Sequence, residues 1–218
     1  MEQNHNKMRL LITSDVHSSF RRFERILDNE SNVDYVVITG DLTDFVASHI
    51  QRIDKILNSK KLKALVVHGN CDPPESIDYI EKSSSMVNLH AKSVEIDDYA
   101  FHGLGGSNYT PFFTPSEYSD DEMRSFINNF EYGEKNVLIS HCPPLGILDL
   151  TYSGIHAGCA VVREIMHNFD VIFCGHIHES PGIYVKDKSN IVLNPGSASS
   201  GRYALFDLNS FDCKLKKI

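Results

Sequence analysis

Short apolar stretches of this sequence repeatedly end in side chains that can bind a metal ion. In the last of them, residues 171–174 are followed by Gly175 and by the triplet His176-Ile177-His178. A strand buried on both faces is apolar throughout, and its carboxyl end opens into the ligand crevice of an α/β protein. Gly175 would let the backbone turn where this strand ends. A lone histidine here would be interpreted as a structural residue, but two histidines separated by one apolar residue favour a metal site.

Three predicted strands near the start of the chain end in the same way. They cover residues 9–13, 34–39 and 63–68, and the polar residues after them are Asp15 and His17, Gly40-Asp41, and Gly69-Asn70-Cys71-Asp72. Helical periodicity separates them over residues 20–27 and 45–57, with Phe45 expected on the buried side of the second helix. Strand, helix, strand is the pattern of parallel βαβ units. We therefore expect these endings at one edge of a single sheet.

The rest of the chain predicts short strands with few helices. Strands are expected at residues 87–89, 93–96 and 99–104 as a meander with a turn at Asp97-Asp98, and at 136–140, 182–185, 190–193, 202–208 and 211–215. Helices are expected at residues 120–130 and 159–167, and His141 follows the strand at 136–140. No linker or repeat interrupts the pattern, so residues 1–218 are expected to form one α/β domain with two sheets.

A loop rich in glycine, proline and aromatic residues covers residues 105–115. Two interpretations have equal weight here. The loop is either a structural cover or a rim of the substrate pocket, because loops of this length are often functional while these residues specify no chemistry.

Composition narrows the classes of protein. The net charge of −8 over 218 residues argues against strong nucleic-acid binding. The five cysteines are scattered and form no CxxC pair, which is typical of a reducing cytoplasm. The start, residues 1–7, is polar, and no apolar run approaches membrane-spanning length. We expect a cytoplasmic protein without a membrane partner.

The polar endings add up to a ligand set for two metal ions. The set contains Asp15, His17, Asp41, Asn70, His141, His176 and His178. Nitrogen and oxygen ligands without thiolate suit Mn, Fe, Ni, Zn or Co. Two such ions, about 3.5–4 Å apart, can hold a phosphate, generate a hydroxide and neutralise an in-line transition state.

The order and spacing of these blocks resemble the calcineurin-like metallophosphoesterase superfamily over nearly the whole chain. Residues 103–108, followed by Thr110-Pro111-Phe112, are similar to the small archaeal and bacterial phosphoesterases related to the Icc cyclic-nucleotide phosphodiesterase. The resemblance implies a four-layer αββα sandwich of two mixed β-sheets flanked by helices. It also implies a dimetal site at the carboxyl ends of the strands.

Carried over residue by residue, the resemblance also implies a role for each ligand. Asp15, His17 and His178 would hold the first metal, Asp41 would bridge both, and Asn70, His141 and His176 would hold the second. A hydroxide bridging the ions would attack phosphorus. Manganese is the preferred metal of this interpretation, with Fe, Ni, Zn, Co or Mg as alternatives.

One position departs from the resemblance. Many members have a histidine after the Gly-Asn pair that can protonate the leaving oxygen, and Cys71 stands there in this chain. A thiol is a poor general acid near pH 7, so Cys71 is either a catalytic residue of limited power or, preferred, an inert residue packed behind the metal. Asp72 would orient a ligand or cap the next helix. His156, in a loop, could reach the substrate phosphate.

The expected function is hydrolysis of phosphate esters, with diesters such as cyclic nucleotides or nucleic-acid ends preferred. The alternatives are a phosphomonoesterase acting on a nucleotide or phosphoprotein, and a non-catalytic metal-binding scaffold. A monoester carries more charge, and the motif regions offer only Arg202 as a cation to neutralise it, which favours the diester. The partner is therefore a small phosphate ester or nucleotide. An exposed edge strand near the carboxyl end could support an oligomer.

Overall fold

A computed structural model describes residues 8–186 and 190–218, and the polar start at residues 1–7 lies outside this range. Its strands form two six-stranded sheets and one two-stranded ribbon. The first sheet contains β1 (Arg9–Thr13), β2 (Tyr35–Thr39), β3 (Ala64–Val67), β4 (Met86–Asn88), β13 (Arg202–Asp207) and β14 (Cys213–Lys217). The second contains β5 (Ser93–Ile96), β6 (Tyr99–Leu104), β9 (Lys135–Ser140), β10 (Val171–Phe173), β11 (Gly182–Val185) and β12 (Ile191–Asn194), and the ribbon pairs β7 (Ser107–Asn108) with β8 (Glu117–Tyr118).

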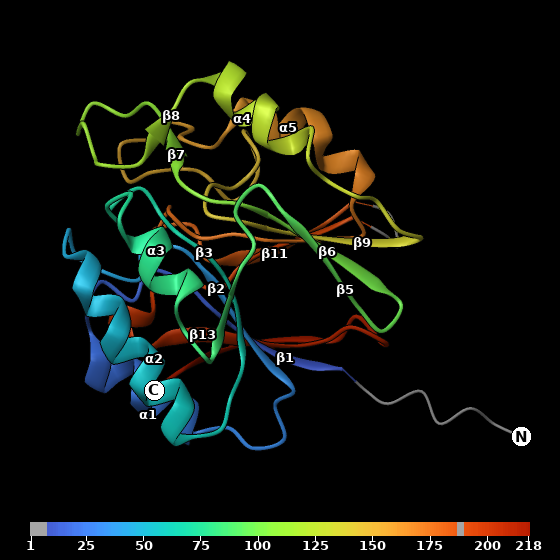
Figure 1. The fold of residues 1–218 in the computed structure, drawn as a ribbon. Coiled ribbons are helices and arrows are strands. Elements are labelled where there is room, and N and C mark those ends of the chain that lie inside the picture. The colour runs from blue at the N-terminus through green and yellow to red at the C-terminus, as the bar shows by residue number, and fades with distance from the viewer. Residues whose placement is uncertain (1–7, 187–189) are drawn as a thin grey trace, which may run out of the picture.

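Five α-helices flank the two sheets. They are α1 (Phe20–Asp28), α2 (Ile50–Ser59), α3 (Ser76–Glu81), α4 (Asp120–Ile127) and α5 (Ala160–Ile165). Figure 1 shows α1, α2 and α3 on the outer side of one sheet and α4 and α5 on the outer side of the other. Among the described residues, no helix is long and apolar enough to cross a membrane.

Strand order explains how the predicted polar endings meet. The first sheet runs β14-β13-β1-β2-β3-β4, with β1 to β4 parallel, and the second runs β11-β12-β10-β9-β6-β5. In the second sheet β9 and β10 are parallel neighbours. The carboxyl ends of β1, β2 and β3 therefore lie side by side at one edge of their sheet, which confirms the βαβ prediction.

The alternation of side chains along each strand builds the layers. In β1, Leu11 packs among residues of α1 and α2, while Leu10 and Ile12 pack between the sheets. In β10, Ile172 packs toward α4 and α5, and Phe173 faces the interior between the sheets. Three apolar cores thus separate four layers, which confirms the αββα sandwich.

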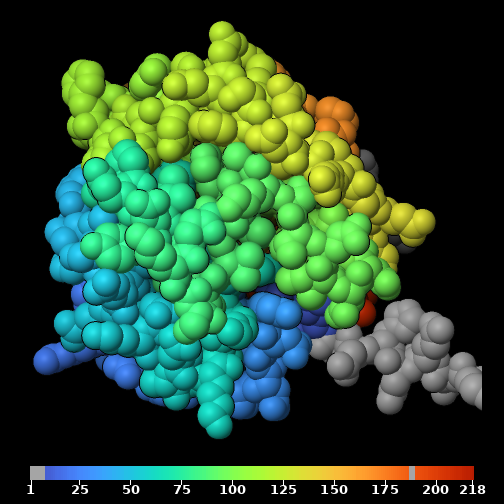
Figure 2. Space-filling view, viewed as in Figure 1, coloured from blue at the N-terminus to red at the C-terminus, as the bar shows by residue number. Residues whose placement is uncertain are grey.

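Two local predictions were wrong. Residues 87–89 were expected in a meander with β5 and β6, but β4 pairs parallel with β3 in the first sheet. The green segment after β4 then passes to the second sheet, between the blue-to-teal and yellow-green parts of the surface (Figure 2). Phe45 is 54% exposed with φ +61°, because the second helix begins only at Ile50, after a single 3₁₀ turn over Ala47–His49.

Candidate metal centre

All seven predicted ligands lie at one end of the sandwich, after the carboxyl ends of parallel strands from both sheets. Asp15 and His17 follow β1, Asp41 follows β2, Asn70 follows β3, His141 follows β9, and His176 and His178 follow β10. Their side chains meet across the gap between the sheets. Three overlapping groups have donor atoms within 4.8 Å of one another: Asp15, His17 and His178; His17, Asp41 and Cys71; and Asp15, Asp41 and His141.

Asp41 belongs to two of these groups. Its Oδ2 is 3.6 Å from Nε2 of His17, and its Oδ1 is 3.5 Å from Nε2 of His141. The two oxygens of one carboxylate thus face histidines from different sheets. A carboxylate in this position can contribute one oxygen to each of two cations.

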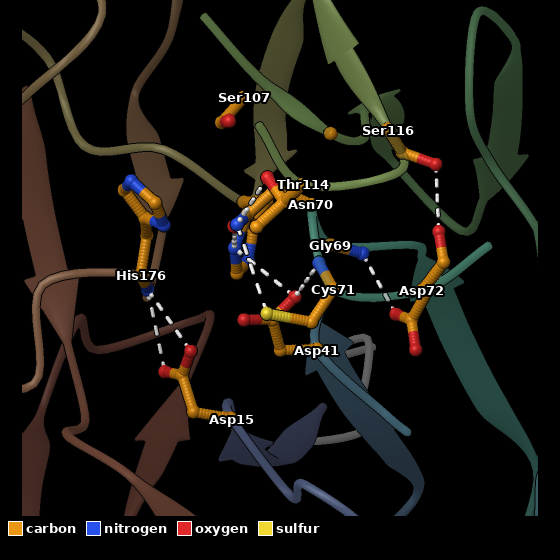
Figure 3. A network of polar contacts seen from close by, with 12 residues as sticks. Asp15, Asp41, Gly69, Asn70, Cys71, Asp72, Ser107, Thr114, Ser116 and His176 are labelled. Atoms are coloured by element: carbon orange, nitrogen blue, oxygen red, sulfur yellow. Dashed lines mark hydrogen bonds and ion pairs between the residues drawn. The ribbon is translucent and has the colours of Figure 1, made fainter. Parts of the chain in front are cut away.

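His17, which follows β1, and His178, which follows β10, converge with Asp15 on a single point. His178 Nε2 is 3.1 Å from Asp15 Oδ1, and the Nε2 atoms of His17 and His178 are 3.3 Å apart. Figure 3 shows that the backbone N–H of His176 also points at the Asp15 carboxylate, with both oxygens 3.3 Å away. One carboxylate and two imidazole nitrogens aimed at a shared point fit a transition-metal ion.

His141 and Asn70 form the opposite side of the centre. Nδ1 of His141 donates to the carbonyl of Thr39 at 2.7 Å, so a neutral ring presents a lone pair at Nε2. Burial lowers the pKa of His141 to about 4, which keeps the ring neutral at pH 7. Nε2 lies 2.8 Å from Oδ1 of Asn70, and the His176 ring is 4.9 Å from the His141 ring. Two acceptors so close together fit a bound cation.

The two buried aspartates differ in their electrostatics. Burial raises the pKa of Asp15, but the hydrogen bond and charge of His178 outweigh it and hold that pKa well below its usual range. Burial and the charges of Asp15 and Asp72 raise the pKa of Asp41 well above its usual range. Divalent ions bound here would lower the pKa of Asp41 and favour both carboxylates in their charged form.

The backbone at the centre is held in an uncommon conformation. Asp15, His17, Asp41 and His176 all have φ between +44° and +66°, a region that costs non-glycine residues free energy. Gly175 has a different role from the one expected, because it is absent from the positive-φ glycines. A Cβ there would lie 1.7 Å from Oγ of Ser14, so glycine is required for the close approach of β10 to β1.

The block after β3 contributes more than a ligand. The N–H of Cys71 donates to Asp41 Oδ1 at 2.8 Å (Figure 3). The half-buried thiol lies near donor atoms of Asp41 and His17. Burial and the Asp41 charge raise the pKa of Cys71, so the thiol stays neutral. Asp72 does not cap α3. Its carboxylate instead accepts from the N–H groups of Leu42 (3.0 Å), Thr43 (2.7 Å) and Gly69 (2.8 Å), which fixes the β2 and β3 loops together.

A cavity of about 670 Å³ opens beside His176 and His178. Tyr109 and Phe112 of the 105–115 loop line it, and both are largely exposed, which supports the interpretation of this loop as a pocket rim. His156 lines it too, with Nδ1 2.6 Å from Oδ1 of Asp149. Among the described residues no lysine or arginine lines the cavity, and Arg202 lies outside it.

Several residues of the centre were not found from the sequence. They are Thr39 and Asp149, which fix the rings of His141 and His156, and Thr114 and Glu117, which contact the Asn70 amide directly and indirectly. Each acts through a loop contact that the spacing of residues in the sequence does not predict. Only Asp149, a carboxylate in the loop that carries His156, offered a weak signal.

Comparisons with known proteins agree with this fold. The sequence model of the calcineurin-like phosphoesterase family matches residues 8–180. The uncharacterized protein MJ1162 of Methanocaldococcus jannaschii is 36% identical over 210 residues, which are 92% of each chain. Among solved structures, TT1561 of Thermus thermophilus has a TM-score of 0.74 at 17% identity over 97% of this chain and 99% of that one. A dimetal phosphatase from Danio rerio has a TM-score of 0.60 at 11% identity over 96% and 95%.

Proposed function

This chain belongs to the calcineurin-like phosphoesterase family, and we propose that it is a dinuclear-metal phosphodiesterase acting on a small phosphate diester or nucleotide. The family makes the protein a metal-dependent phosphoester hydrolase and implies a centre of two divalent ions. The observation that carries the proposal is Asp41, whose two oxygens face His17 and His141 from different sheets.

The geometry supports one assignment of the ligands. Asp15, His17 and His178 would hold one ion, and Asn70, His141 and His176 the other, with Asp41 shared between them. Bound ions supply a hydroxide nucleophile near neutral pH and neutralise charge that develops on the phosphate. Manganese is the metal we propose, because mixed nitrogen and oxygen ligands accept it readily.

His156 is the group that we propose for the leaving oxygen. It lines the cavity next to His176 and His178, and the buried Asp149 holds its Nδ1. A ring oriented in this way points Nε2 away from Asp149, and in its protonated, imidazolium form it can donate the Nε2 proton to an ester oxygen. Cys71 stays neutral beside Asp41 and supplies no cation, so its proposed part is packing behind the metal rather than proton donation.

The cavity supports the diester over the monoester. A monoester carries about two negative charges near neutral pH and a diester one. The described residues that line the cavity include no lysine or arginine, and its rim is aromatic. The five cysteines are all unpaired, which supports the cytoplasm as the compartment. We further propose that residues 1–218 act as one domain, because one apolar core joins the two sheets.

Hydrolysis of matched aryl phosphate mono- and diesters tests the proposal. The protein is stripped of metal, and Mn, Ni, Zn or Mg is added back while bound ions per chain are counted. Diester turnover restored by a transition metal is the expected result. Monoester turnover alone would favour a phosphatase, and two bound ions without turnover of either ester would contradict a catalytic role on these substrates.

A further inference from the structure

We infer that Thr114 and Glu117 are positioning residues that fix which end of the Asn70 amide faces the second metal. The inference rests on the proposed function, because it assumes that Asn70 is a ligand. An asparagine can coordinate a cation only through Oδ1, and a half-turn of the side chain puts the Nδ2 donor in its place. Something in the protein must therefore set the orientation.

The hydrogen bonds of Thr114 set it. The Thr114 hydroxyl has one proton, and it donates that proton to Oε1 of Glu117 at 2.6 Å. Its oxygen can then only accept from Asn70, and Nδ2 of Asn70 donates to it at 3.0 Å. With Nδ2 held by Thr114 (Figure 3), Oδ1 faces the second imidazole, since it lies 2.8 Å from Nε2 of His141.

Glu117 is built to be an acceptor. Its carboxylate accepts from the backbone N–H of Thr110 (3.1 Å), the N–H of Thr114 (2.9 Å) and both threonine hydroxyls. Burial raises the pKa of Glu117, but these hydrogen bonds outweigh it and lower the pKa below its usual value. An ionised carboxylate has no proton to give, so the direction of the Thr114–Glu117 bond cannot reverse.

The loop that carries these residues is also tied to the block after β3. The N–H of Ser116 donates to the carbonyl of Asn70 at 3.1 Å, and Oγ of Ser116 donates to the carbonyl of Asp72 at 2.6 Å. Thr114 is therefore held in register with Asn70 from both sides. Apart from Thr114, the described residues in polar contact with the Asn70 amide are His141, whose Nε2 faces Oδ1, and Cys71, whose thiol is 3.7 Å from Nδ2.

The alternative orientation explains what Thr114 prevents. Without an ion, a flipped amide would donate from Nδ2 to the free lone pair of His141 Nε2, which is a favourable hydrogen bond. That bond would compete with the metal for both ligands at once. Contacts of this kind around metal ligands typically change metal affinity by about 10- to 100-fold.

Metal binding by Thr114→Val tests the inference, and Thr110→Val is the matched control. Both changes remove a threonine hydroxyl bonded to Glu117, but only Thr114 contacts Asn70. Titration calorimetry with Mn²⁺ or Co²⁺ should show that Thr114→Val weakens the binding of one of the two ions by about 10-fold or more. We expect wild-type metal affinity in Thr110→Val and restored affinity in Thr114→Ser, and the visible spectrum of the Co²⁺ form should change only in Thr114→Val.

A second background separates orientation from general loop damage. In Asn70→Asp both ends of the side chain can accept, so orientation no longer matters, and adding Thr114→Val should change metal affinity little further. Equal losses in Thr110→Val and Thr114→Val, or a full Thr114→Val effect in the Asn70→Asp background, would overturn the inference. Wild-type protein that fails to bind two ions would instead contradict the proposed function.

Discussion

The buried carboxylate of Glu30 and the buried aspartates of the metal centre differ in how the chain compensates their charge. Glu30, whose side chain is 5% exposed, lies against the outer face of the first sheet, where Arg9 Nη2 is 3.4 Å from it. Lys216 forms a closer ion pair with Glu30, and the Tyr203 hydroxyl donates to it at 2.6 Å. The chain supplies every partner that this carboxylate needs.

Asp15, Asp41 and Asp72 are as deeply buried, but their surroundings differ. Within residues 8–186 and 190–218, neither lysine nor arginine forms an ion pair with any of the three. Asp72 is satisfied by backbone N–H groups, and Asp15 pairs with His178, whose pKa it raises. Asp41 instead faces His17 and His141, whose pKa values are lowered by burial. Burial of a charge without a partner is costly, so the Asp41 carboxylate suits a cation from outside the chain, whereas Glu30 has its cations within the chain.

Of the substitutions that test this difference between the two sites, Asp41→Asn should have the largest effect. The amide keeps the shape but cannot offer two anionic oxygens, so we expect turnover to fall by about 10³-fold or more. In metal-free protein the same change replaces a buried carboxyl group whose pKa is raised and which has no cationic partner, so thermal stability should be unchanged or higher. Steady-state kinetics and a melting curve of the stripped variant measure both. Near-normal turnover would remove Asp41 from the bridging position.

Metal removal should lower stability in a manner that depends on pH. Each ion present at about 100 times its dissociation constant stabilises the fold by about 2.7 kcal/mol. Because the pKa of Asp41 is raised in the metal-free chain, a proton must leave before an ion binds. Apparent affinity should therefore increase as pH rises from 5.5 to 8, with protons released on binding. Calorimetry in buffers of different ionisation enthalpy checks this, and a flat pH profile would contradict it.

Cys71→His should shift the substrate preference. The native thiol is neutral beside Asp41, whereas an imidazole there can carry charge toward the phosphate. We expect monoester hydrolysis to rise relative to diester hydrolysis by roughly 10-fold, below the usual contribution of a general acid. Cys71→Ser is the control, because it stays neutral. An unchanged ratio of the two activities would show that Cys71 only packs.

Glu30→Gln should affect stability alone. Burial raises the pKa of Glu30, but the bonds from Lys216 and Tyr203 outweigh it and lower the pKa in the folded state. A lowered folded pKa means that the stabilisation is full above the unfolded value and is lost as pH falls through the folded one. Urea unfolding should show a loss of about 1–3 kcal/mol at pH 7 that shrinks toward pH 3, with turnover unchanged. An equal loss at both pH values would argue against a charge effect.

The sequence was most informative where polar residues follow apolar strands. The endings at Asp15, Asp41 and Asn70 could be placed at one edge because parallel strands share it, and the sheet order of β1, β2 and β3 agrees. Membership of the short strand at Met86–Asn88 could not be predicted, since three residues carry no information about which sheet they join. Phe45 followed helical spacing and is nevertheless exposed, because periodicity does not reveal where a helix begins.

The supporting residues of the site could not be predicted for a different reason. Thr114 and Glu117 belong to a loop whose path depends on contacts with Ser116 and the β3 loop, and not on any local pattern. The positive φ angles of Asp15 and Asp41 likewise arise from backbone hydrogen bonds between loops, such as that from the N–H of Asp15 to the carbonyl of Gly40 at 3.0 Å.

The placement of the ligands on both sheets has a consequence for the integrity of the whole molecule. His17 and His178 are 161 positions apart in the sequence, yet their Nε2 atoms meet at 3.3 Å. Ions bound between them would act as a non-covalent cross-link that closes most of the polypeptide into one ring. Such a cross-link resists any opening of the sandwich along its middle plane, so the bound ions would make the separation of one sheet from the other and the loss of the catalytic centre a single event.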